Sequence, residues 1–203
     1  MNLPNSLTFF RISLIPIFVA VFYVPFGWAH ATTAIIFALG GLTDWLDGYL
    51  ARRLGQTSAF GAFLDPVADK LLVAVALVLL VQHDPRPWLA VAAAVIIGRE
   101  IVISALREWM AELGKRTKVA VSQVGKVKTT AQMLAIFLML YREPLGPIPT
   151  YGIGIALLYA AAALTLWSMF VYLRSAWPLL RVGLPPGRSE TPVTPSATPR
   201  PGT

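Results

Sequence analysis

Four aspartates in a short window of the chain have the residue type and the spacing of a catalytic or metal-binding site. Asp44 and Asp47 are three residues apart. The second pair, Asp65 and Asp69, is four residues apart. Either spacing places two side chains on one face of a helix. Long apolar runs flank the window, and a charge at the centre of a membrane helix costs about 2.5–3.5 kcal/mol, so four such charges indicate a function.

Carboxylates that gather in a low-dielectric environment cannot all stay ionised unless cations neutralise them. Hard divalent ions with oxygen ligands suit such a cluster, so we expect Mg²⁺ or Mn²⁺, as one ion or as two ions that share carboxylates. The chain contains no cysteine, and neither of its two histidines lies in this window. A zinc site with soft ligands is therefore disfavoured.

Small residues and basic side chains accompany the carboxylates. Gly48, Ala51 and Gly61 lie on or beside the carboxylate faces and leave room for a bulky ligand near the backbone. Arg52 offers a planar set of donors that matches a phosphate group. Lys70, next to the last aspartate, either pairs with the carboxylates, which we favour, or reaches a bound phosphate. A site for divalent metals, space for a ligand beside the small residues and an arginine together suggest that the ligand is a nucleotide diphosphate.

The same residues resemble the D-x2-D-G-x2-A-R-x8-G-x3-D-x3-D signature of the CDP-alcohol phosphotransferase family, without a departure. The matching positions are Asp44, Asp47, Gly48, Ala51, Arg52, Gly61, Asp65 and Asp69. This resemblance implies a membrane enzyme, often a homodimer, that moves a substituted phosphate from a CDP-linked donor to an alcohol and releases CMP. It also implies that the aspartates hold two divalent metal ions, that the last aspartate is the base, and that the small residues and Arg52 bind the CDP group.

The N-terminal pattern Pro4-Asn5-x-Leu7-Thr8-x-x-Arg11 resembles the branch of the family that uses glycerol phosphate. In that resemblance Asn5, Thr8 and Arg11 lie near the donor head group. The alternative is a helix cap by Asn5 or Thr8, together with an Arg11 side chain that faces lipid and reaches the cytoplasmic interface.

Basic residues in the second half of the chain resemble the same branch. They lie in or near the sequences REWMAELGKR and GKVKT, and the resemblance implies that they bind the acceptor phosphate. The candidates are Arg107, Lys126 and Lys128, together with Arg99 and Arg116. A GKVKT sequence before a helix N-terminus also suits an anion, because the free amides and the helix dipole favour negative charge. The alternatives are a pair of Arg99 with Glu100 or with an aspartate that only holds the helix bundle together, and basic residues that serve only membrane topology.

The composition indicates a single integral membrane domain. Of 203 residues, 56% are hydrophobic and 13% are charged, which leaves too little polar surface for an ordinary soluble domain. The net charge of +7 lies mainly between the apolar runs. Membrane lipid and phosphorylated substrates, rather than nucleic acid, are therefore the expected partners.

We predict an all-α integral membrane protein with six transmembrane helices. The predicted spans are 8–26, 31–53, 60–81, 88–113, 130–141 and 151–173. A short interfacial segment, 2–7, precedes them, and the membrane domain covers 1–181. The polar connection 53–60 makes the second and third spans an antiparallel hairpin, in which the two aspartate pairs face each other at one depth. The tail, 182–203, is rich in proline and threonine and is predicted to be disordered.

The positive charges orient these spans. Of the 17 lysines and arginines, 13 fall on the side of both termini and the hairpin turn, and two fall on the other side. The positive-inside rule then places both termini and the aspartates on the cytoplasmic side of a bacterial inner membrane. CDP-linked donors and glycerol phosphate are cytoplasmic metabolites, so topology and chemistry agree.

The resemblance implies transfer of the phosphatidyl group of CDP-diacylglycerol to glycerol 3-phosphate, with release of CMP, in phospholipid biosynthesis. Asp44, Asp47 and Asp65 would hold the ions, and Asp69 would be a ligand or would take the proton from the acceptor hydroxyl. Two alternatives stay open: a sister enzyme that uses inositol phosphate, inositol or serine, and a divalent-cation transporter. A purely structural membrane protein would explain the hydrophobicity but not the four aspartates.

Overall fold

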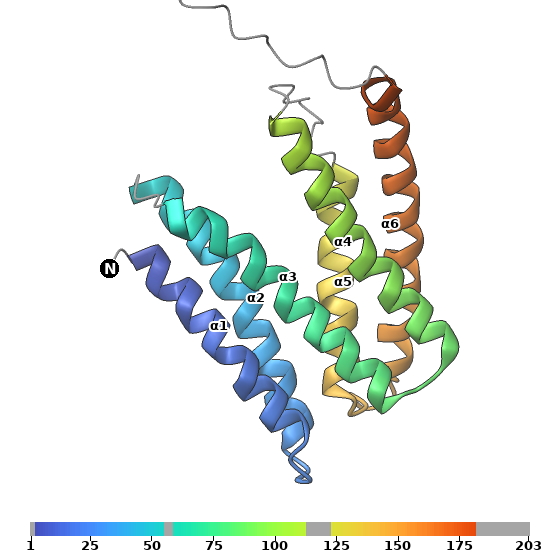
Figure 1. Cartoon of the computed structure of the whole chain (residues 1–203). Coiled ribbons are helices and arrows are strands. Elements are labelled where there is room, and N and C mark those ends of the chain that lie inside the picture. The colour runs from blue at the N-terminus through green and yellow to red at the C-terminus, as the bar shows by residue number, and fades with distance from the viewer. Residues whose placement is uncertain (1–2, 55–58, 113–122, 182–203) are drawn as a thin grey trace, which may run out of the picture. The chain divides into compact units, whose positions relative to one another are not determined.

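The computed structural model describes residues 3–54, 59–112 and 123–181, and at some helical positions it describes the backbone only. Within these ranges the chain forms six α-helices and no strand (Figure 1). The helices are α1 (Leu3–Phe22), α2 (Ala29–Leu54), α3 (Ala59–His83), α4 (Pro87–Glu112), α5 (Gln123–Tyr141) and α6 (Thr150–Arg181). The prediction of an all-α chain is confirmed, whereas the predicted tail, 182–203, lies outside the described residues.

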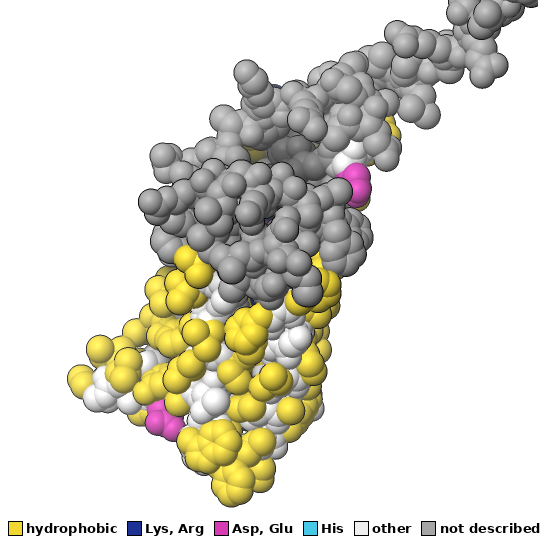
Figure 2. Space-filling view, turned by 90° about the vertical axis from the view of Figure 1, so that its left-hand side faces the viewer, with side chains coloured by type: hydrophobic (Ala, Val, Ile, Leu, Met, Phe, Trp, Pro, Cys, Tyr) yellow, Lys and Arg dark blue, Asp and Glu magenta, His cyan; other side chains and the backbone are white. Residues whose placement is uncertain are grey.

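Two of the described helices are long and apolar enough to cross a membrane: Pro87–Leu106 within α4 and Thr150–Val171 within α6. Six membrane crossings therefore remain a prediction. Hydrophobic side chains nevertheless cover most of the described part of the face in Figure 2. Exposed Trp88, Trp167 and Ile101 have relative accessibilities of 74%, 68% and 65%. Such surface is typical of a protein that meets lipid.

Two helices, α1 and α5, begin several residues before the predicted spans. α1 begins at Leu3, so the helix continues through most of the segment expected to be an interfacial lead-in. Pro4 does not prevent this, because a proline in the first turn removes no intrahelical hydrogen bond. α5 begins at Gln123 rather than at residue 130, and it includes Gly125. The polar, glycine-containing start of α5 concealed its first two turns from a pattern based on hydrophobicity.

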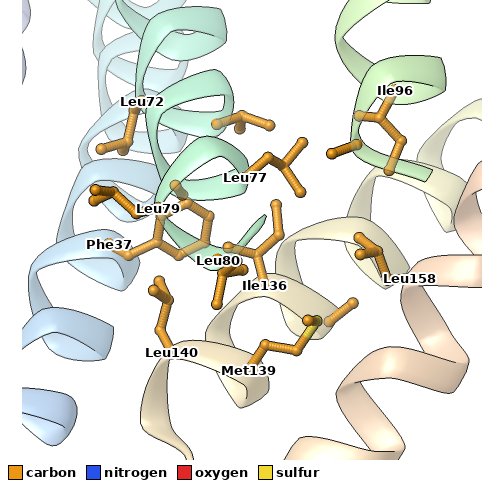
Figure 3. Close-up of a cluster of buried hydrophobic side chains, with 14 of the residues drawn as sticks. Phe37, Leu72, Leu77, Leu79, Leu80, Ile96, Ile136, Met139, Leu140 and Leu158 are labelled. Atoms are coloured by element: carbon orange, nitrogen blue, oxygen red, sulfur yellow. The ribbon is translucent and has the colours of Figure 1, made fainter. Parts of the chain in front are cut away.

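The described residues up to Met169 form one compact unit, and those from Phe170 to Arg181 belong to a second one. In the first unit, α2 and α3 pack against each other and against both α1 and α5, and α4 packs on α3 (Figure 1). Its core joins side chains from all six described helices. The members labelled in Figure 3 are Phe37, Leu72, Leu77, Leu79, Leu80, Ile96, Ile136, Met139, Leu140 and Leu158. Burial of these side chains brings together the helices that carry the predicted site residues.

Glycine allows close packing at two helix contacts. A Cβ atom at Gly40 of α2 would lie 2.3 Å from a methyl carbon of Leu72 on α3. A Cβ atom at Gly154 of α6 would lie 2.7 Å from the Met139 side chain and 3.0 Å from the Ala135 carbonyl oxygen, both on α5. At Gly154 the neighbours include backbone atoms, so glycine is required there, as at the small-residue interfaces of membrane helices. At Gly40 the neighbour is the end of the flexible Leu72 side chain, which would have to move to admit a larger residue.

A polar cluster joins the helix ends farthest from the predicted hairpin turn. The Arg142 guanidinium, just after α5, donates to ring nitrogens of His30 on α2 and His83 on α3, each at 3.2 Å. It also lies 5.1 Å from the centre of the Phe22 ring on α1. Arg142 has φ +62°, in the left-handed region that ends the helix. This cluster ties together the ends of four helices, about 20 Å along their axes from the aspartates.

Candidate active site

A cavity of about 610 Å³ opens between α2, α3, α4 and α5. Its polar lining residues are Asp44, Asp69, Lys70, Glu100, Thr129, Thr130 and Gln132. Its apolar lining residues are Phe37, Ala38, Gly41, Val73, Met133, Leu134 and Phe137. One described aspartate of each predicted pair therefore lines the same cavity, as the hairpin prediction requires.

The carboxylate of Asp44 is held by a buried arginine from α1. Arg11 is fully buried at 0% exposure, and its Nη1 lies 3.2 Å from Oδ1 of Asp44. Its Nε donates to the Thr43 hydroxyl at 3.4 Å, and that hydroxyl donates to the Gly40 carbonyl oxygen at 2.8 Å. The alternative in which Arg11 faces lipid and reaches the interface is wrong, because its guanidinium is instead fixed between two helices.

Thr8 is also buried, at 1% exposure, on α1. It lies in the second turn of a helix that begins at Leu3, so it does not cap that helix. Asn5 lies in the first turn, where only the backbone is described.

Asp69 occupies the opposite wall, on α3. It lies within electrostatic range of Asp44 and Glu100, which are negative, and of Arg11 and Lys70, which are positive. Lys70 donates a hydrogen bond to the Ser104 hydroxyl on α4. The predicted pairing of Lys70 with carboxylates is therefore a longer-range interaction, and its direct contact is with a hydroxyl.

Arg99 and Glu100 form an ion pair, with Nη1 of Arg99 3.1 Å from Oε1 of Glu100. The ion pair named in the structural alternative for Arg99 is thus present, but both residues lie on α4, so this pair does not hold two helices together. Nε of Arg99 is buried and has no hydrogen-bond partner among the described residues. A buried donor without a partner costs about 1–3 kcal/mol, so a bound anion could use it.

The basic stretch GKVKT lies inside α5 rather than before it. Because α5 begins at Gln123, Lys128 and Thr129 lie beyond the first turn, where backbone amides are already bonded within the helix. The argument that free amides at this sequence bind an anion is wrong for these two residues. Lys128 is almost fully buried, at 2% exposure, whereas Thr129 lines the cavity.

The remaining predicted site residues have no described side chain. In helices with only the backbone described lie Asn5, Asp47, Gly48, Ala51, Arg52, Gly61, Asp65, Arg107 and Lys126. Arg116 lies outside the described residues. The structure consequently brings together Asp44 and Asp69 and leaves the other ligands and the CDP-binding residues as predictions.

The described carboxylates fit a divalent cation in donor type. Asp44 and Asp69 offer hard oxygen donors from facing helices of one cavity, as Mg²⁺ and Mn²⁺ require. Among the described side chains no three Asp, Glu, His or Cys residues gather into a metal-binding group. The second carboxylate of each pair, Asp47 or Asp65, belongs to the positions without a described side chain.

Sequence reasoning missed two features of the cavity. Glu100 was considered only as a partner of Arg99, although a glutamate in a long apolar run is itself a signal of function. Gln132 and Thr130, three and one residues after Thr129, line the α5 wall, and Gln132 is buried at 5% exposure. Their polarity within an apolar helix was the available signal.

Comparison with known proteins gives a consistent result. Residues 1–167 match the CDP-alcohol phosphatidyltransferase family. The chain is 59% identical over 175 residues to the CDP-diacylglycerol--glycerol-3-phosphate 3-phosphatidyltransferase of Pectobacterium atrosepticum, which covers 86% of this chain and 94% of that protein. It is 60% identical over 176 residues to the protein of the same name from Sodalis glossinidius, and this match covers 87% of this chain and 95% of that protein. The Yersinia enterocolitica protein of that name is 57% identical over 180 residues.

Proposed function

Because this chain belongs to the CDP-alcohol phosphatidyltransferase family, we propose that it transfers the phosphatidyl group of CDP-diacylglycerol to glycerol 3-phosphate and releases CMP. The observation that carries this proposal is the meeting of Asp44 and Asp69, from the two halves of the signature, in one cavity. The donor and the acceptor follow from the names of relatives that are 57–60% identical over nearly their whole length.

The four aspartates would hold two ions, Mg²⁺ or Mn²⁺; they are Asp44, Asp47, Asp65 and Asp69. When bound, the ions supply positive charge that neutralises the donor diphosphate and the departing CMP. Arg11 keeps the Asp44 carboxylate in a fixed position through its 3.2 Å contact. This preorganisation matters because a metal ligand must be held before the ion arrives.

Asp69 takes the proton from the 1-hydroxyl of glycerol 3-phosphate. The hydroxyl oxygen then attacks the phosphorus that bears diacylglycerol, and the bond from that phosphorus to the bridging oxygen of CMP breaks. The product is phosphatidylglycerophosphate. The CDP group is bound by Asn5, Thr8, Gly48, Ala51, Arg52 and Gly61. The acceptor phosphate is bound by basic residues from the second half of the chain, namely Arg99, Arg107, Arg116, Lys126 and Lys128.

The apolar walls of the cavity suit a lipid donor. Phe37, Val73 and Leu134 line it beside the charged residues, so a ligand with a charged head and an apolar continuation matches both parts. The exposed apolar side chains support a membrane protein, for which we propose six crossings. We place both termini and the cavity on the cytoplasmic side of a bacterial inner membrane, and we expect a homodimer.

The test is CMP release by the purified protein in detergent with CDP-diacylglycerol, Mg²⁺ or Mn²⁺, and one acceptor at a time. We expect release with glycerol 3-phosphate, and none with inositol, inositol phosphate, serine or excess EDTA. Asp69→Asn should lower the rate by about 10²–10⁴-fold, the usual contribution of a general base. Asp84→Asn, at the aspartate that is not part of the signature, is the matched control and should keep the activity.

Release with another acceptor would retain the metal site and overturn the assignment of glycerol 3-phosphate. Folded protein that releases no CMP with any acceptor would contradict the proposed reaction itself. Thermal stabilisation by CMP, measured in the same detergent, shows whether the protein is folded and competent to bind nucleotide.

A further inference from the structure

Glu100 is a carboxylate in the cavity that the aspartate signature does not include. It lies on α4 and lines the same cavity as Asp44 and Asp69. Its side chain is 36% exposed, whereas Ile96 and Ile103 on the same helix are buried at 1% and 6%. A carboxylate within an apolar helix is costly, so its retention calls for a ligand or a partner that needs it.

Contacts with α3 and within α4 hold Glu100 at the cavity wall. Arg99 donates to its Oε1 at 3.1 Å, and the Ser104 hydroxyl donates to its main-chain carbonyl oxygen at 2.6 Å. Lys70 of α3 donates to that same hydroxyl. Because residues four apart share a helix face, the contact between Lys70 and Ser104 directs the face that carries Glu100 toward α3.

The charges of the cavity decide which end of the acceptor can lie near Glu100. A carboxylate repels a phosphate group, so the phosphate is bound by the basic residues, Arg99 among them, and not by Glu100 itself. A hydroxyl group, by contrast, donates a hydrogen bond to an ionised carboxylate, which acts only as an acceptor. The two carboxylate oxygens of Glu100 can accept further hydrogen bonds besides the one from Arg99, so the ion pair leaves Glu100 able to bind a hydroxyl group.

The proposed acceptor carries one hydroxyl more than the reaction consumes. The 1-hydroxyl attacks phosphorus, and the neighbouring 2-hydroxyl enters the same cavity, where Phe37, Val73 and Leu134 cannot accept a hydrogen bond. Apart from the two aspartates assigned to the metal ions, the lining residues that can accept one are Glu100, Thr129, Thr130 and Gln132. Of these four, Glu100 alone is a carboxylate, and hydrogen bonds to an ionised acceptor are the stronger ones. An unsatisfied hydroxyl in such a place would weaken binding.

We propose that Glu100 accepts a hydrogen bond from the 2-hydroxyl of the acceptor and so makes the enzyme select a polyol phosphate over a simple alcohol phosphate. Glu100 binds substrate in this proposal and transfers no proton. The inference rests on the proposed function, because it requires glycerol 3-phosphate in the cavity.

The experiment compares two acceptors that differ only at this hydroxyl, glycerol 3-phosphate and 3-hydroxypropyl phosphate, with CMP release as the readout. The wild-type chain should lose at least about tenfold in kcat/KM when the 2-hydroxyl is absent, because a hydrogen bond to a charged group is lost. Glu100→Ala should act on the two acceptors at nearly equal rates. Glu100→Gln retains a weaker acceptor oxygen, so its ratio of kcat/KM for the two acceptors should lie between the ratios of the wild type and of Glu100→Ala. Glu108→Gln, at an exposed glutamate of α4 outside the cavity, should keep the wild-type ratio.

A structural role for Glu100 would lower kcat/KM for both acceptors by the same factor in each Glu100 variant, and that result would overturn the inference. A wild-type chain that does not discriminate between the acceptors would also overturn it. If Glu100→Ala does not fold, Glu100→Gln decides, because a wild-type ratio in this variant contradicts the proposal. Absence of CMP release by the wild-type chain with either acceptor would instead reject the proposed function, on which this inference depends.

Discussion

At the scale of single residues, the salt bridge between Arg11 and Asp44 is the contact that most directly prepares the proposed active site. Arg11 is fully buried, whereas the Asp44 side chain is 47% exposed into the cavity. The pair therefore has one desolvated member and one member that can still meet a ligand. Its value lies in the position of the Asp44 carboxylate more than in the free energy of the pair.

Arg11→Met should lower CMP release by at least about tenfold, because Asp44 loses the donor that orients it. The free energy of unfolding should fall by about 1–3 kcal/mol, since Thr43 and Asp44 each lose a hydrogen-bond partner. Arg11→Lys should be intermediate, because an ammonium group lacks the planar fork that reaches both partners. CMP release and thermal unfolding in detergent measure the two effects, and full activity in Arg11→Met would contradict this role.

At the scale of helices, glycines in α6 offer a matched pair for testing the packing of α6 on α5. Gly154→Ala places a Cβ atom 3.0 Å from the backbone oxygen of Ala135, which cannot move without shifting α5. We expect this variant to be destabilised by about 1–3 kcal/mol. Gly152→Ala meets no atom closer than 3.9 Å and should be neutral or slightly stabilising, because alanine favours helix. Equal thermal unfolding midpoints for the two variants would show that this contact is absent.

The polar cluster at the other helix ends should make stability depend on pH. Partial burial, then Arg142 and His30, lower the pKa of His83 below its ordinary value of 6.5, and Asp84 opposes this shift. The hydrogen bond from Arg86, and then that from Tyr151, lowers the pKa of Asp84 below 3.8.

His83 and Asp84 both make the folded chain less stable as the pH falls, because each group binds fewer protons in the folded chain than in the unfolded chain. The contribution of His83 is present above pH 6.5 and is lost as the pH falls through its lower folded pKa. Protonated His83 can no longer accept a hydrogen bond from Arg142. The thermal midpoint should therefore fall on acidification from about pH 7.5 to about pH 5, and His83→Gln should reduce that fall. The change should be modest because His83 is exposed, and an equal fall in His83→Gln would assign it to other groups.

At the scale of the whole molecule, the proposed topology can be tested without a cysteine-free background variant, because the chain has no cysteine. Pro85→Cys lies in the connection between α3 and α4, and Ser58→Cys lies in the predicted hairpin turn. In intact cells whose outer membrane is permeable, a maleimide that cannot cross the inner membrane should label Pro85→Cys only. Both variants should react after the inner membrane is opened. The reverse labelling would place the cavity on the wrong side for cytoplasmic CDP-linked donors.

The sequence by itself determined which helices form, which aspartates share a helix face and which family signature they complete. These properties depend on local periodicity and on residue spacing, so they can be read along the chain. The predicted helix ends were less accurate, as at the start of α5, because hydrophobicity does not mark a polar first turn.

Only the tertiary structure decided the partner of each charged side chain. Arg11 meets Asp44 across 33 positions of the chain, and Lys70 meets Ser104 across 34. Such pairs depend on how each helix is rotated about its axis and packed against its neighbours, which follows from the close fit of the whole core. For the same reason, a pattern along α4 did not reveal that Glu100 faces the cavity, whereas the packing of α4 against α3 placed it there.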